Sequence, residues 1–158
     1  MTTEHKVIGG IALLTIAILV GGVFFLSKGS NSSVPADQVV ASNGLHWHPK
    51  VTVTIKGEKQ EIPANLGLGG AVHGKIHTHD TDAKDDVVHI EAQGVVTKDD
   101  TRLGRFFQVW GKDFNLTTIM DKKNDQGGTV KMLVNGKENA EFENYLMKDG
   151  DKIEISYE

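Results

Sequence analysis

The histidines are the most conspicuous candidates for a functional site in this chain, because six of the seven fall between positions 46 and 89. Four of them form two His-x-His pairs, His46 with His48 and His77 with His79. In an extended chain, residues i and i+2 point to the same face, about 6.6 Å apart along the strand. Each pair can therefore direct two imidazoles to one side. Imidazole nitrogens bind transition metals, so the two pairs predict a metal site.

The predicted ligands are all imidazoles, because the chain has no cysteine to supply a thiolate. This ligand type suits Zn, Cu(II) or Ni. Asp80 and Glu91 are predicted to support the ligands by accepting hydrogen bonds from imidazole nitrogens that do not bind the ion. Whether the two pairs meet in one site stays open, and any one histidine alone is better explained as a polar residue on a solvated sheet edge. The predicted ligand set is drawn from His46, His48, His77, His79 and His89.

Other kinds of binding site are less well supported by the sequence. The acidic run at 80–86 lacks the glycine and the terminal glutamate of a calcium loop. The glycine-rich segment 67–70 is not followed by Lys-Ser/Thr, as a phosphate-binding loop requires. The net charge of -4, without a lysine or arginine cluster, argues against nucleic acid as a partner.

An apolar run at 7–26 carries no charged side chain, and as a helix it spans about 30 Å, the thickness of a bilayer core. It is longer than the apolar part of a usual signal peptide and no small-x-small cleavage pattern follows it, so we predict an uncleaved signal-anchor over residues 1–27. The flanking charges are nearly balanced, and a short cytoplasmic N-terminal tail sets the predicted orientation. Residues 28–43 have the composition of a flexible linker. Residues 44–158 are then predicted to form an extracytoplasmic domain on the cytoplasmic membrane.

This domain is predicted to be α+β, with strands in which apolar and polar residues alternate. Asn135-Gly136 is typical of a tight hairpin turn. Residues 63–86 are rich in glycine and predict a long loop that carries three histidines. Long loops in compact domains tend to be functional or disordered. The predicted strands cover residues 51–55, 59–62, 86–92, 130–134, 137–142 and 153–157.

One soluble helix is predicted at 101–111, where Leu103, Phe106, Phe107 and Trp110 form a single apolar stripe. Strands, one main helix and then further strands are the order of a β-grasp (ubiquitin-like) fold, in which the helix packs across a mixed sheet. This likeness concerns the fold and implies nothing about function.

Three sets of sequence blocks stand out, at 44–49 with 62–67, at 76–80 with 88–91, and at 103–107 with 110–112 and 134–139. Together they resemble a known group of proteins. These are uncharacterised, membrane-anchored proteins from archaea and from poorly cultured bacterial lineages, in which a single N-terminal span precedes a domain with the same histidine motifs. The resemblance covers most of residues 43–158. It implies a membrane anchor and an extracytoplasmic domain, and it implies no activity.

The function that these patterns favour is an extracytoplasmic module that holds or delivers Cu or Zn at the cell surface. A metal-dependent enzyme would need an open coordination position and a carboxylate base such as Asp80 or Glu91. No nucleophile or acid/base motif argues for catalysis, so binding is favoured over an enzyme. A surface module for an unidentified protein partner, with structural or pH-sensing histidines, is the other alternative.

Overall fold

The computed structural model describes Thr15, Ile18, residues 34–69 and residues 73–158. It divides into two compact units, Met1–Val34 and Pro35–Glu158. The predicted membrane span lies outside the described residues, apart from Thr15 and Ile18. Within the part of the chain that is described, no helix is both long and apolar enough to cross a membrane.

The second unit is α+β, with mixed sheets and few helices, as the sequence predicts. Its helical segments are η1 Ala36–Gln38, η2 Ala83–Asp85, α2 Lys98–Thr101, α3 Leu103–Trp110 and η3 Phe142–Asn144. Its strands are β1 Val39–Ala41, β2 Leu45–Trp47, β3 Lys50–Ile55, β4 Glu58–Gln60, β5 Ile76–His77, β6 His89–Ala92, β7 Val96–Thr97, β8 Phe114–Asn115, β9 Thr118–Ile119, β10 Lys122–Lys123, β11 Val130–Val134, β12 Lys137–Glu138 and β13 Lys152–Tyr157.

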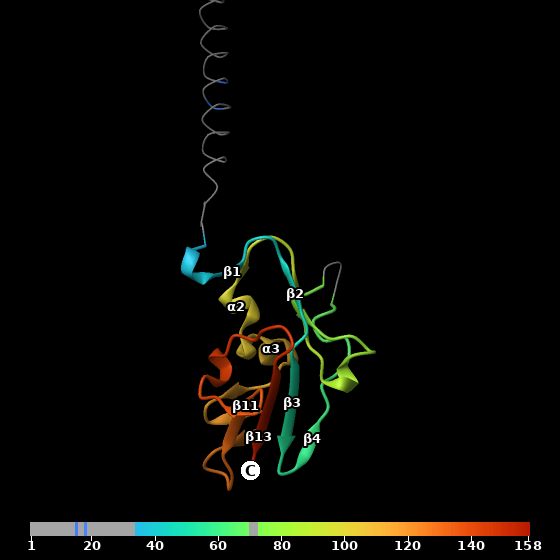
Figure 1. Cartoon of the computed structure of the whole chain (residues 1–158), viewed down its shortest axis with the longest axis vertical. Helices are drawn as coiled ribbons and strands as arrows, with labels where there is room; N and C mark the ends of the chain where they lie inside the picture. The colour runs from blue at the N-terminus through green and yellow to red at the C-terminus, as the bar shows by residue number, and fades with distance from the viewer. Residues whose placement is uncertain (1–14, 16–17, 19–33, 70–72) are drawn as a thin grey trace, which may run out of the picture. The chain divides into compact units, whose positions relative to one another are not determined.

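The largest sheet has the strand order β12-β11-β13-β3-β4. Its central strands, β3 and β13, are parallel, and the outer pairings are antiparallel. Figure 1 shows β11, β13, β3 and β4 side by side. The predicted hairpin turn at Asn135-Gly136 is confirmed, and a second hairpin turn lies at Lys56-Gly57; all four residues have positive φ. Two positive φ angles match the turn to the twist of the flanking strands.

The predicted apolar stripe is confirmed, because Leu103, Phe106, Phe107 and Trp110 are all buried on α3. They share one core with the buried side chains of β3, β11 and β13. Gly111 ends the helix with a φ of 69°. The helix begins later than predicted because the backbone at residue 102 is extended and separates α2 from α3.

Smaller sheets complete the unit. Strands β2, β6 and β5 form an antiparallel sheet, β8, β9 and β10 form a second one, and β1 pairs with β7. The β1–β7 pairing brings residues 39–41, part of the predicted linker, into the compact unit, which begins at Pro35. This pairing joins segments more than fifty positions apart in the sequence.

Candidate metal centre

The sheet β2-β6-β5 collects histidines from three separate segments on one face. In its register His77 pairs with His89, and His46 pairs with Glu91. Paired residues of antiparallel strands lie on the same face, and so do residues i and i+2 of one strand. The four side chains therefore share a face. His48 directly follows β2, and His79 lies two positions after the end of β5. The two pairs approach His89 from opposite sides.

The other face of this sheet belongs to the core. Ile76 and Ile90 are register partners and both are buried, and Trp47, opposite Ile90 on β2, packs against the same core. The apolar face fixes the register, because a slip by one residue would turn Ile90 to the histidine side and His89 into the core. The sequence pattern that builds the sheet thus also orients its imidazoles.

The imidazoles form two groups of three that share His89. We call His77, His79 and His89 the inner triad, and His46, His48 and His89 the outer triad. In each triad the candidate ligand nitrogens all lie within 4.8 Å of one another. Three nitrogens bound to one zinc ion at about 2.1 Å would lie about 3.4 Å apart, so modest side-chain rotations bring either triad to coordination distance.

The ring spacings are similar in the two triads. The ring centroid of His89 is 4.7 Å from that of His79 and 4.7 Å from that of His48. Within the pairs, the centroids of His77 and His79 are 4.8 Å apart and those of His46 and His48 are 4.5 Å apart. His89 therefore stands midway between the pairs.

Burial distinguishes the triads. His77 is 1% exposed and His89 is 8% exposed. The side chains of His46 and His48 are 53% and 44% exposed. Two members of the inner triad are thus buried and His79 is half-buried, whereas two members of the outer triad face solvent.

Hydrogen bonds fix the orientation of the two buried rings. Nδ1 of His77 lies 3.0 Å from the carbonyl oxygen of Gly74, and Nε2 of His89 lies 3.0 Å from Oδ2 of Asp82. Since a carbonyl or a carboxylate can only accept, these two nitrogens carry the protons. The lone pairs then belong to Nε2 of His77 and Nδ1 of His89. A ligand histidine fixed through its other nitrogen is the usual arrangement around protein-bound metals.

Those two lone-pair nitrogens are buried and have no hydrogen-bond partner among the described residues. A buried polar atom without a partner costs about 1–3 kcal/mol. A metal ion bound by the inner triad would satisfy both atoms at once. The two unsatisfied nitrogens are the strongest structural sign of a metal site in this unit.

The charge state of the buried rings also suits a cation. Burial lowers the pKa of His77 and of His89 below the ordinary value of 6.5, because desolvation disfavours the charged imidazolium. The hydrogen bonds to Gly74 and Asp82 act in the opposite direction and only partly offset this lowering. Both rings are therefore neutral at neutral pH, which is the form that binds metal.

Thr78 locks the inner His-x-His pair in place. Its backbone N–H donates to the carbonyl of Leu66 at 3.1 Å, and its hydroxyl donates to the carbonyl of Pro63 at 2.8 Å. The same hydroxyl accepts a hydrogen bond from the N–H of Leu66 at 3.1 Å. Thr78 is fully buried, so the imidazoles on either side of it have a fixed backbone.

Gly67 allows this loop to approach β5, and replacing it is expected to damage the site. It has a φ of 70°, and a Cβ there would overlap the carbonyl oxygen of Ile76. Gly67→Ala is expected to lower the free energy of unfolding by at least about 2 kcal/mol, from left-handed strain plus the clash, and to weaken metal binding. The control is Gly57→Ala, which has a φ of 85° and open space at its Cβ, and so measures the strain alone. Equal losses of stability in urea unfolding of the two variants would contradict the predicted clash.

The carboxylate that accepts a hydrogen bond from a buried imidazole is one that the sequence analysis did not single out. Asp82 is the residue that holds His89, although its only signal in the sequence is membership of an acidic loop. Oδ1 of Asp80 accepts a hydrogen bond from Asn65 at 2.7 Å instead. Oε2 of Glu91 lies 3.9 Å from Nε2 of His46 and 4.0 Å from Nε2 of His77, close enough to act on both triads electrostatically.

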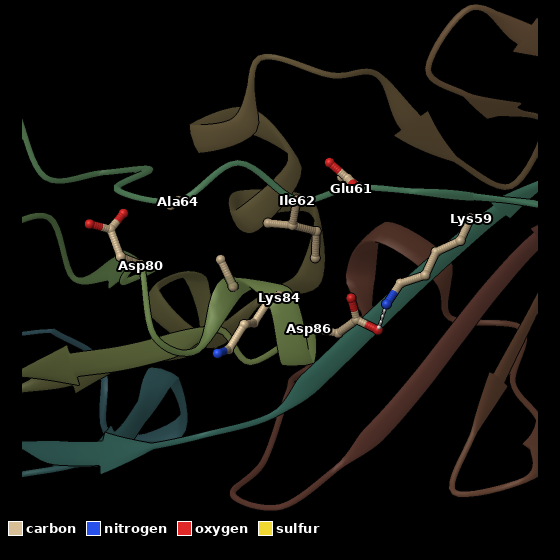
Figure 2. Close-up of a pocket in the computed structure, with 8 residues that line it drawn as sticks. Lys59, Glu61, Ile62, Ala64, Asp80, Lys84 and Asp86 are labelled. Carbon is tan, nitrogen blue, oxygen red and sulfur yellow. Dashed lines mark ion pairs between the residues drawn. The ribbon is translucent and has the colours of Figure 1, made fainter.

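Asp80 lies at a different feature, a polar pocket of about 350 Å³. Figure 2 shows its carboxylate at one end of the pocket and the ion pair of Lys59 with Asp86 at the other. The Nζ of Lys59 is 2.8 Å from Oδ2 of Asp86, which also accepts a hydrogen bond from Thr52. The residues that line the pocket are Lys59, Glu61, Ile62, Ala64, Asp80, Ala83, Lys84 and Asp86.

Comparison with protein-family models, with curated proteins and with solved structures finds no match to this chain. The interpretation of the site therefore rests on its geometry. Three neutral imidazoles can hold a divalent ion and leave one position for water or for a further ligand. His73 lies beside the inner triad, its ring centroid 5.6 Å from that of His77, and belongs to neither triad.

Proposed function

We propose that this protein is a membrane-anchored, extracytoplasmic module that binds a divalent transition-metal ion, Cu or Zn, through its paired histidines. One observation carries the proposal. The lone-pair nitrogens of His77 and His89 are buried without a partner, while the second nitrogen of each ring is held by Gly74 or Asp82. Rings that served only a structural role would be expected to use both nitrogens, because an unsatisfied buried atom destabilises the fold.

The same observation favours metal binding over a pH-sensing surface module. A pH sensor of the usual kind has a histidine that gains a partner when it is protonated. The free nitrogens of His77 and His89 instead share a triad with a third imidazole, so protonation would bring positive charges together. A divalent cation can use all three nitrogens without adding protons.

We also propose that the second unit is a β-grasp domain, in which two strands of the histidine sheet are inserted and the third, β2, precedes β3. The strand order β4-β3-β13-β11-β12, with its parallel central pair, and the packing of α3 against the same core support this assignment. The inserted strands are β5 and β6, which lie between β4 and α3 in the sequence. The membrane anchor rests on the apolar run at 7–26.

The decisive experiment measures metal content and affinity of the full-length chain, purified in detergent without a histidine tag, and of the double variant His77→Ala/His79→Ala. The wild-type protein is expected to bind one equivalent of Cu or Zn. The double variant keeps one inner ligand and the exposed outer triad, so it is expected to bind the ion much more weakly. A ligand at about 100 times its Kd adds about 2.7 kcal/mol to stability, so at the same metal concentration the melting temperature should rise more for the wild-type chain than for the double variant.

The control is His73→Ala, which removes a neighbouring imidazole that belongs to neither triad. This variant should still bind one equivalent of metal. Absence of bound metal from the wild-type protein, together with an unchanged melting temperature on metal addition, would refute the proposed function. Circular dichroism of the double variant tests that its loss of affinity is not a loss of fold.

A further inference from the structure

The two triads share His89, and only one ring nitrogen of His89 can bind a metal ion. His89 belongs to both groups of candidate ligands. Its Nε2 donates to Asp82, so only Nδ1 is available to an ion. An imidazole lone pair lies in the ring plane and binds one ion at a time. Two ions can therefore not be held by both triads together while the bond to Asp82 persists.

We propose that the triads are two successive positions of a single ion, which is captured by the outer triad and passes to the inner triad by ligand exchange around His89. This inference rests on the proposed function and adds a direction of travel to it. The ion keeps its bond to His89 while it exchanges His46 and His48 for His77 and His79. No step leaves the ion without a protein ligand.

The outer triad has the properties of a capture site. The side chains of His46 and His48 are about half exposed, and each has a carboxylate close by. Oε2 of Glu91 is 3.9 Å from Nε2 of His46, and Oδ1 of Asp149 is 3.7 Å from Nδ1 of His48. Negative charge at a solvent-facing site attracts cations and raises the rate at which they arrive.

Asp149 also holds the outer triad in place. It accepts a hydrogen bond at 2.8 Å from the backbone N–H of His48, across a separation of 101 positions in the sequence. The turn before β13 is thereby joined to the end of β2. The outer imidazoles thus have a fixed backbone while their rings face water.

The inner triad has the properties of a holding site. It contains both of the buried nitrogens that lack a partner, those of His77 and His89, whereas the outer triad contains one of them. Low exposure strengthens the attraction between the cation and nearby charges such as Glu91, whose Oε2 is 4.0 Å from Nε2 of His77. The ion is therefore expected to rest at the inner triad at equilibrium.

The kinetic test compares the full-length wild-type chain with the double variant His46→Ala/His48→Ala. Zinc uptake is followed by stopped flow, and zinc release is followed after addition of excess chelator. The variant should still bind one equivalent with nearly unchanged affinity, because the inner triad is intact. Its association and dissociation rate constants should both fall, by at least about tenfold, because the outer position that speeds both directions is gone. The matched control His73→Ala should exchange zinc at the wild-type rate.

Several outcomes would overturn the inference while leaving the proposed function in place. Two equivalents bound by the wild-type chain would mean that the triads fill together. Unchanged rates in the double variant, or equal slowing in His73→Ala, would mean that the outer triad is not on the path. Loss of the bound equivalent in the double variant would place the equilibrium site at the outer triad. Failure of the wild-type chain to bind any metal would instead remove the proposed function itself.

Discussion

Replacement of His89 by alanine is expected to abolish stoichiometric metal binding, with an affinity loss of at least about 100-fold, or about 2.7 kcal/mol. The reason is that His89 is the one ligand common to both triads. Its removal leaves the pairs His46/His48 and His77/His79, each with two imidazoles. A double variant of the outer pair, by contrast, leaves the complete inner triad. Isothermal titration of the full-length chain with zinc measures the difference.

Two controls separate a lost ligand from a damaged fold. His89 is 8% exposed, so its truncation opens a small cavity, and the unfolding free energy of the metal-free variant has to be compared with that of the metal-free wild-type chain. His73→Ala removes an imidazole outside the triads and should keep the wild-type affinity. Wild-type zinc affinity in the His89→Ala variant would show that neither triad holds the ion as described.

Local patterns in the sequence were sufficient to predict which side chains share a face. The alternation around β6 places Ile90 on the core side and His89 with Glu91 on the other, and the structure has this arrangement. The stripe on α3 and the turn at Asn135-Gly136 are equally local and were also predicted correctly. Each of these features depends on residues within a few positions of one another, where periodicity is informative.

The meeting of the two His-x-His pairs could not be predicted, because it depends on how a long loop returns to the sheet. The return is fixed by contacts between the loop and Thr78, whose hydroxyl and backbone bind Pro63 and Leu66. Gly67 and Gly74 contribute close backbone approaches that no side chain in the sequence signals. Such contacts are not encoded in a local pattern.

For a similar reason, the sequence could not predict which acidic residue of the loop contacts His89. Asp80 and Asp82 are equally plausible partners for an imidazole by residue type. The chain turns after His79, whose carbonyl accepts hydrogen bonds from the N–H groups of Asp82 and Ala83. This turn carries the Asp82 carboxylate to His89, and Asp80 bonds Asn65. A turn of a few residues therefore decided which carboxylate supports the site.

Acidification is expected to destabilise the metal-free protein and to release the metal from the loaded one. His77 and His89 have folded-state pKa values below 6.5, whereas in the unfolded chain they titrate at the ordinary value. Between these values the unfolded state binds more protons, so stability falls as pH falls. The contribution of the two neutral rings is fully present above about pH 6.5 and is lost as pH drops through their folded-state pKa values. The pKa of Asp82 is also lowered, by its hydrogen bond to His89, so Asp82 stays ionised throughout this range.

The stability of the metal-loaded protein should fall more steeply with decreasing pH than that of the metal-free protein. The reason is that each imidazole that must lose a proton to bind the ion can lower the metal affinity by up to about tenfold per pH unit. Urea unfolding at about pH 7.5 and about pH 5.5, with chelator and with zinc, separates the two effects. The double variant His77→Gln/His89→Gln should lose most of the pH dependence in chelator, since glutamine does not titrate. Metal-free stability that stays level or rises on acidification in the wild-type chain would contradict the assignment of these rings as buried and neutral. A zinc affinity that is the same at both pH values would show that the ion is not held by histidines.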